Sequence, residues 1–180
     1  MVYILLGRGF EEAEAVIPCD LLRRAGIAVQ LVGIGGLEIC GGHGMTLRAD
    51  LTVEEIDLDA LEMLVLPGGM GGVRSISSCE AALRAVRFAA ENGRYVAAIC
   101  AAPTILAKLG LTDGRRATCY PGMEGEMGGA VVQKGARAVR DGKILTGTAA
   151  GTAFEFGAAL IAALRGEAAA RDVLHAVVYT

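Results

Sequence analysis

The 180-residue sequence contains no tryptophan, and its five cysteines include no C-x-x-C pair. This spacing indicates neither a zinc site nor a disulfide framework, so a reducing cytoplasm is the compartment that we expect. No apolar run reaches the ~18 residues of a membrane span, and the apolar start lacks the basic region of a signal peptide. Lysine and arginine form no cluster along the chain, and the net charge of −3 argues against nucleic-acid binding.

What the chain has is apolar surface, since 53% of its residues are hydrophobic. Stretches typical of strands and helices alternate along it, which predicts one α/β domain over residues 1–180, with a doubly wound, mostly parallel sheet sandwiched by helices. Two further local patterns are a hairpin around a glycine-rich turn and a capping box, Thr152-x-x-Glu155, before the last long helix. The expected strands are 2–6, 28–32, 63–66, 95–99 and 143–146, the hairpin strands are 37–40 and 45–49, and the expected helices include 12–25 and 80–92.

Cys100 stands between a strand and a helix. The residues before it, 95–99, are apolar and uncharged, as expected of a strand buried on both faces of a parallel sheet. Small residues and Pro103 follow, which is typical of the start of a helix. A sharp turn there would raise the sulfur above the carboxyl end of the sheet, where open α/β folds bind ligands. This geometry predicts a cysteine nucleophile elbow, and a buried structural cysteine is the alternative.

Carboxylates follow the first strand, at the start of the next helix. Residues 7–14 lack the third glycine of a dinucleotide fingerprint and the Gly-Lys-Ser/Thr of a P-loop. Glu11 and Glu12 are explained as first-turn acids that suit the helix dipole. Glu14 lies one turn deeper, on a helix whose N-terminus points to the same sheet edge as Cys100, so its carboxyl is a candidate hydrogen-bond partner of the thiol.

A glycine turn ends the strand at 63–66. Pro67 is followed by Gly68 and Gly69, and glycine lets a backbone N–H approach a reacting atom closely. Both glycines are therefore candidate substrate-binding residues at the same edge.

Four segments together resemble a known family. Residues 9–18, 66–69, 97–103 and 151–156, which read GFEEAEAVIP, LPGG, AAICAAP and GTAFEF, are similar to the ThiJ/PfpI superfamily in its parkinsonism-associated deglycase (DJ-one) branch. The resemblance spans nearly the whole chain in consistent order. It implies a flavodoxin-like sandwich, chemistry without a cofactor and, usually, a homodimer.

The resemblance also implies roles for single residues. Cys100 is then the reactive cysteine and Glu14 the carboxyl that hydrogen-bonds it. The backbone N–H groups of Gly69 and Ala101 form the anion pocket beside the sulfur. We expect neither a metal ion nor a cofactor in this site.

Departures from related enzymes narrow the function. Intracellular proteases of the superfamily carry histidine directly after the cysteine, where this chain has Ala101. Glutamine amidotransferases need a late histidine with an acid two residues on, and His175 is followed by Ala176 and Val177. Many members of the deglycase branch have histidine in place of Tyr120. The Tyr120 hydroxyl could donate a hydrogen bond, but with a reference pKa of about 10 it is a poor general base.

His43 lies on the glycine-rich hairpin, where relatives often carry an arginine that reaches the partner subunit's site. We predict a homodimer in which His43 lies near Cys100 of the partner chain, and a solvent-exposed turn histidine is the alternative. His175 is interpreted as structural or exposed.

Two functions of different classes fit these residues. The first is a cofactor-independent, glyoxalase III-type or deglycase-like enzyme in which the Cys100 thiolate attacks a small dicarbonyl such as methylglyoxal and Glu14 shuttles a proton. The second is a non-enzymatic redox sensor or chaperone, in which the same cysteine oxidises to a sulfinate. In both, we expect a pKa of Cys100 below the reference of about 8.5, with Glu14 protonated and the two groups titrating together.

Overall fold

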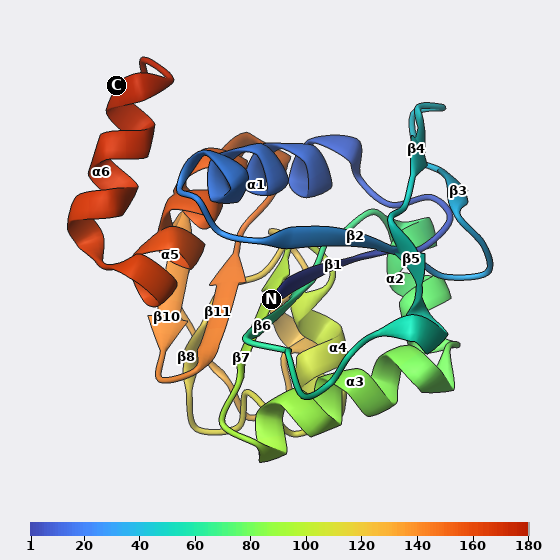
Figure 1. The fold of residues 1–180 in the computed structure, drawn as a ribbon. Helices are drawn as coiled ribbons and strands as arrows, with labels where there is room; N and C mark the ends of the chain where they lie inside the picture. The colour runs from blue at the N-terminus through green and yellow to red at the C-terminus, as the bar shows by residue number, and fades with distance from the viewer. Residues whose placement is uncertain (180) are drawn as a thin grey trace.

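A central sheet organises the molecule. The computed structural model describes residues 1–179, and within them seven strands form one sheet in the order β10-β11-β7-β6-β1-β2-β5 (Figure 1). Neighbouring strands run parallel, apart from the antiparallel edge pair β10 and β11. The predicted doubly wound, mostly parallel sheet is therefore confirmed. The strands are β1 (Val2–Leu6), β2 (Val29–Gly33), β5 (Leu51–Thr52), β6 (Met63–Leu66), β7 (Tyr95–Ile99), β10 (Ala138–Asp141) and β11 (Ile144–Gly147).

Helices cover both faces of the sheet because its strands are apolar on both sides. In β1, Val2, Ile4 and Leu6 pack with α1, α5 and α6, while Tyr3 and Leu5 pack with α2, α3 and α4. Figure 1 shows α1 on one side of the sheet and α3 and α4 on the other. None of the helices within residues 1–179 is both long and apolar enough to cross a membrane. The helices are α1 (Glu12–Arg24), α2 (Met70–Ser77), α3 (Glu80–Glu91), α4 (Pro103–Lys108), α5 (Ala153–Arg165) and α6 (Glu167–Ala176).

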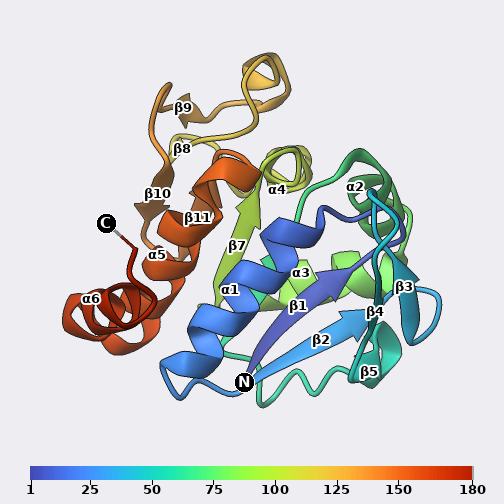
Figure 2. The ribbon, with the colours of Figure 1, turned by 90° about the horizontal axis from the view of Figure 1, so that it is seen from above.

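Two small sheets lie outside the sandwich. β3 (Glu38–Cys40) and β4 (Thr46–Arg48) form the predicted antiparallel hairpin. β8 (Arg116–Ala117) and β9 (Val131–Val132) pair in parallel, and Figure 2 shows that these two pairs extend from different sides of the molecule. Three short 3₁₀ turns complete the structure: η1 (Val53–Glu55), η2 (Glu124–Glu126) and η3 (Ala150–Thr152).

The predicted capping box before α5 is wrong. The Thr152 hydroxyl donates to the Ala149 carbonyl at 2.8 Å and accepts the Ala149 N–H at 3.1 Å, so it closes η3 instead of capping α5. Glu155 turns away toward two partners distant in sequence, the Arg137 guanidinium and the Tyr179 hydroxyl. Thr152 is therefore held by a backbone neighbour three residues before it, and Glu155 by groups distant in sequence. The other predicted boundaries agree with the structure to within one or two residues, and the strands at 63–66 and 95–99 agree at both ends.

The order in which strands are added to the sheet reverses once along the chain. From β1 the chain moves outward to β2 and β5 on one side, while β6, β7 and β11 lie on the other. The topological switch point therefore lies between β1 and β6, and open α/β sheets bind ligands at such points. The segments that follow β1, β6 and β7 meet there.

Candidate active site

Cys100 occupies the predicted elbow directly after β7. Its backbone φ of 68° lies in the left-handed region, where residues other than glycine are rare and strained. Two hydrogen bonds hold this conformation, from the Cys100 N–H to the Gly147 carbonyl at 3.0 Å and from the Tyr120 N–H to the Cys100 carbonyl at 2.7 Å. The half-buried Cys100 side chain is thereby set at the carboxyl edge of the sheet, and the sharp strand-to-helix turn expected of an elbow is confirmed.

Glu14 is completely buried on α1, beneath the thiol. Its Oε2 accepts the Gly68 N–H at 2.8 Å, and the Cys100 side chain is its other polar partner. Among residues 1–179, no nitrogen or oxygen donor reaches its Oε1. Burial raises the pKa of Glu14 to about 7, against the lowering effect of its hydrogen bonds with Cys100 and Gly68.

The two glycines after β6 leave room for this pair. A Cβ on Gly68 would lie 2.6 Å from Glu14 Oε2 and 2.7 Å from the Cys100 Cβ, so any side chain here would displace one of them. Gly69 has a φ of 79°, and a Cβ there would lie 2.5 Å from the Gly9 carbonyl oxygen. With no side chain in the way, the Gly69 N–H and the Ala101 N–H both donate to the Cys100 sulfur.

The thiol is less acidic than the sequence suggested. Burial, the negative charge of Glu14 and the hydrogen bond to Glu14 raise the pKa of Cys100 to about 12, despite the N–H groups of Ala101 and Gly69, which lower it. The predicted low pKa is therefore wrong, because burial and the charge of Glu14 outweigh the N–H groups that favour a thiolate. The predicted order, with Cys100 ionised while Glu14 is protonated, is reversed. The two groups still behave as a pair that holds one proton between pH 7 and pH 12.

A pocket of about 250 Å³ opens in front of the sulfur. Tyr120, 48% exposed, forms part of its wall. Methionine side chains make the wall largely apolar, and Glu11 contributes a carboxylate. The pocket is lined by Glu11, Gly69, Met70, Cys100, Ala101, Tyr120 and Met123.

His43 lies on the β3–β4 hairpin and contacts α1 of its own chain. Its Nδ1 lies 3.0 Å from Glu12 Oε2 and 3.4 Å from Glu11 Oε2. Glu12 Oε1 also accepts the backbone N–H groups of His43 at 2.8 Å and Met45 at 3.4 Å. Burial raises the pKa of Glu12, but the hydrogen bonds from His43 and Met45 outweigh it and leave the pKa lowered. The hydrogen bond between the His43 ring and Glu12 in turn raises the pKa of His43.

The interpretation of Glu12 as a simple first-turn acid is therefore wrong, since it is only 3% exposed and anchors the hairpin. The sequence offers one indication of this contact, the glycine at position 41. The structure explains it, because a Cβ on Gly41 would lie 2.3 Å from Glu12 Oε1. Glu11, Glu12 and His43 also bring ligand atoms within 4.8 Å of one another. This donor set suits a divalent cation, although the hydrogen bonds between Glu12 and His43 already account for its geometry.

Three other cysteines and His175 are not part of the pocket lining. Cys19 and Cys119 are buried, and burial raises the pKa of both thiols, that of Cys119 to about 11. Cys79 is half-buried at the start of α3. His175 is exposed on the last turn of α6, as expected.

Comparison with known proteins agrees with this geometry. The protein dj-1beta of Drosophila melanogaster is 33% identical over 172 residues, which cover 94% of this chain and 92% of that one. A deglycase of Pyrococcus abyssi is 36% identical over 126 residues, covering 70% of this chain and 75% of its own length.

Solved structures give the same result. The crystal structure of Drosophila DJ-1beta superimposes with a TM-score of 0.95 at 31% identity, covering 99% of this chain and 97% of that one. A structure of oxidised DJ-1 from Toxoplasma gondii superimposes with a TM-score of 0.95 at 26% identity, covering 99% and 98%. The family model described as DJ-1/PfpI matches residues 1–163. With its elbow cysteine, buried glutamate and paired glycines, the chain belongs to the DJ-1/PfpI family.

Proposed function

We propose that the protein is a cofactor-independent enzyme that converts methylglyoxal and related small dicarbonyls to hydroxy acids, either free or as adducts on amines and thiols. The observation that carries the proposal is the pairing of Cys100 with the buried Glu14 at the mouth of an open pocket. The deglycase-named relative from Pyrococcus abyssi supports the same class of chemistry.

The first step is attack by sulfur on the aldehyde carbon. Glu14, ionised above pH 7, accepts the thiol proton as the new S–C bond forms. The aldehyde oxygen takes up that proton, which yields a hemithioacetal and restores the carboxylate. The N–H groups of Gly69 and Ala101 are placed to stabilise the transient oxyanion, a role in which one donor is worth about 3 kcal/mol.

The second step moves hydrogen between the two carbons. Glu14 removes the proton from the former aldehyde carbon to give an enediol and returns a proton to the neighbouring carbon. The product is a lactoyl thioester on Cys100. Water then cleaves the S–C bond, releasing lactate and restoring the thiol. One water is consumed in all, and the oxidation of one carbon balances the reduction of the other.

Two other groups support this cycle. The Gly68 N–H holds Glu14 Oε2 in place, and Tyr120, which lines the pocket, would donate its hydroxyl to the second carbonyl of the substrate. Tyr120 supplies no base, so the mechanism relies on Glu14 alone for proton transfer.

The direct test is to incubate the pure protein with methylglyoxal and follow lactate by proton NMR. We expect lactate from the wild type and from Cys79→Ser, whose thiol is half-buried outside the pocket, and none from Cys100→Ser. Equal lactate from all three proteins, or none from the wild type, would refute the proposal.

A redox sensor is the second candidate. The same N–H groups and a protonated Glu14 would hold the oxygens of a Cys100 sulfinate, and a DJ-1 relative has been crystallised in oxidised form. Mass spectrometry after brief peroxide treatment should find the sulfinate at Cys100 first, because Glu14 beside it can take the thiol proton, whereas preferential oxidation of Cys40 or Cys119 would contradict the sensor. A wild type that oxidises at Cys100 but makes no lactate would favour the sensor.

We further propose a homodimer in a reducing cytoplasm, where all five cysteines stay free. An apolar groove of about 250 Å³ between α1 and β4 includes Leu31 and Leu47, and Val16 beside them is 45% exposed. Pairing through this face would bring the β3–β4 hairpin of one subunit toward the other subunit. The proposed approach of His43 to the partner's site requires such an arrangement. Sedimentation of Val16→Glu should show monomer if this face pairs.

A further inference from the structure

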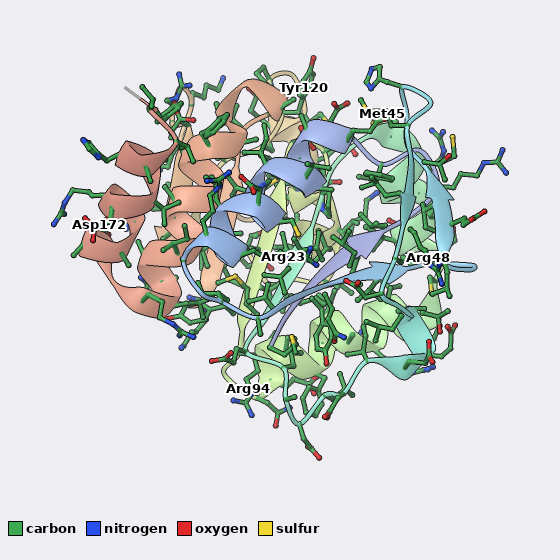
Figure 3. All side chains as sticks on the ribbon, turned by 45° about the horizontal axis from the view of Figure 1, so that its top comes forward. Arg23, Met45, Arg48, Arg94, Tyr120 and Asp172 are labelled. Carbon is green, nitrogen blue, oxygen red and sulfur yellow. The ribbon has the colours of Figure 1, made fainter. Side chains whose placement is uncertain are left out.

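A second pocket lies at the opposite end of the sheet from Cys100. It holds about 240 Å³ between the end of α3, the turn after α4 and the β10–β11 turn. Figure 3 shows Arg94 at one end of the molecule and Tyr120 at the other. The two pockets share no lining residue. The second one is lined by Ala90, Arg94, Gly110, Leu111, Asp113, Arg115, Lys143 and Ile144.

The charge of this pocket is opposite to that of the chain. Arg94, Arg115 and Lys143 line it together with one acid, Asp113, while the whole chain carries −3. The three cations are far apart in sequence, which is why no basic cluster is visible along the chain. Folding thus concentrates positive charge at one place on an acidic protein.

The nearby carboxylates are engaged mainly elsewhere. Asp113 Oδ1 accepts the Gly129 N–H at 3.0 Å, and Glu62 binds the N-terminal ammonium at 2.7 Å. Asp141 Oδ2 accepts the Arg116 N–H at 2.9 Å, while its Oδ1 forms an ion pair with Arg115 Nη1 at 3.9 Å and so neutralises one of the three cations. The cationic groups of the pocket are therefore only partly neutralised.

One hydrogen-bond donor of Arg94 is buried without an acceptor in the described part of the chain. Its Nε is buried and has no hydrogen-bond partner anywhere in residues 1–179. Buried donors are almost always paired, so an unpaired one calls for an acceptor from outside the chain. Lys143 is held beside it, with Nζ 3.8 Å from the centre of the Tyr95 ring, which restrains the ammonium at the rim.

We propose that this pocket binds a small anion carrying a phosphate group. Guanidinium groups recognise phosphate oxygens through paired hydrogen bonds, and an ammonium adds a point charge. Three cations against Asp113 and Asp141 leave a local charge of about +1, which favours a phosphate monoester that carries −1.5 to −2 at pH 7. The volume is below that of a usual drug-sized site, roughly 300–1,000 Å³, so the ligand is compact.

The test is titration with inorganic phosphate and with glycerol 3-phosphate, at constant ionic strength, followed by amide NMR. We expect saturable shifts of the Gly110 and Leu111 amides and unchanged Gly69 and Ala101 amides. Acetate should bind at least tenfold more weakly than phosphate. Saturation equal to that with acetate would point to a general anion site and overturn the assignment to phosphate.

Variants decide whether these side chains form the site. Arg94→Gln should weaken phosphate binding at least tenfold. The double variant Arg115→Gln with Lys143→Gln changes two exposed residues and keeps the test valid if Arg94→Gln fails to fold. Arg171→Gln, exposed on α6, is the matched charge control and should bind as the wild type does. Cys100→Ser should also bind normally, whereas loss of binding there, or unchanged binding in the double variant, would refute the second site.

Discussion

Glu12 and Glu14 stand two residues apart on one helix and are both almost fully buried, yet their pKa values move in opposite directions. Glu12 meets a histidine ring and two backbone N–H groups, which favour its charged form. Glu14 meets one N–H and a thiol, too little to offset burial. Burial alone therefore does not decide the state of a carboxyl; its partners do. Glu12 anchors the hairpin as a carboxylate, and Glu14 has the raised pKa that the proposed mechanism needs of a base.

The largest expected effect is on turnover. Glu14→Gln should lower kcat for methylglyoxal by roughly 10²–10⁴-fold, the usual contribution of a positioned acid–base group. The matched variant Glu12→Gln should lose less than tenfold, because its carboxyl touches the hairpin and not the thiol. Steady-state kinetics of the two variants checks this, and equal losses would erase the distinction between them.

The turnover of the wild type should also depend on pH. Turnover by the wild type should rise as the pH increases through about 7, because Glu14 must be ionised to take the thiol proton. A flat profile between pH 6 and 8 would remove Glu14 from the role of base.

Stability should respond to pH with opposite signs at the two sites. Burial raises the pKa of Glu14 from 4.5 to about 7, so the folded chain holds more protons than the unfolded chain between these values and loses stability as the pH rises through them. That shift corresponds to about 3 kcal/mol. Urea unfolding at pH 4 and pH 8 should therefore show Glu14→Gln gaining stability over the wild type only at the higher pH.

Glu12→Gln should show the reverse. Its hydrogen bonds lower the pKa of Glu12, so the carboxylate stabilises the fold above pH 4.5 and this stability is lost as the pH falls through the lowered value. We expect a loss of about 1–2 kcal/mol at pH 7, from weaker hydrogen bonds to a neutral amide. The two unfolding curves should converge near pH 3, and a constant gap at all pH values would indicate a packing effect.

The smallest effect belongs to His43, which is exposed. Its raised pKa means that the ion pair with Glu12 stabilises the fold below pH 6.5 and fades as the pH rises through the higher folded value. His43→Gln should lower the melting temperature slightly at pH 6 and leave it unchanged at pH 9. A melting temperature that is unaffected at pH 6 would show that the backbone N–H groups hold the hairpin alone.

Prediction from the sequence succeeded where the chain itself sets the geometry. The apolar strand before Cys100 and the small residues after it are local, and they were sufficient to predict the elbow. It failed for Glu12, Thr152 and the acidity of the thiol. Glu12 and the thiol depend on groups brought close only by folding, the hairpin at His43 and Glu14 buried against Cys100. Thr152 failed locally, because its hydroxyl bonds to the Ala149 backbone instead of capping the helix.

The pocket in front of Cys100 has a floor and an outer wall that come from different parts of the chain. Its reactive floor comes from the sheet edge, where Gly68 admits no side chain. Its outer wall comes from Met70 at the start of α2 and from Tyr120 and Met123 in the loop after β8, with Met70 and Tyr120 about half exposed. Substitutions at these outer residues can therefore change which small molecules fit the pocket without altering the residues around the Cys100 sulfur.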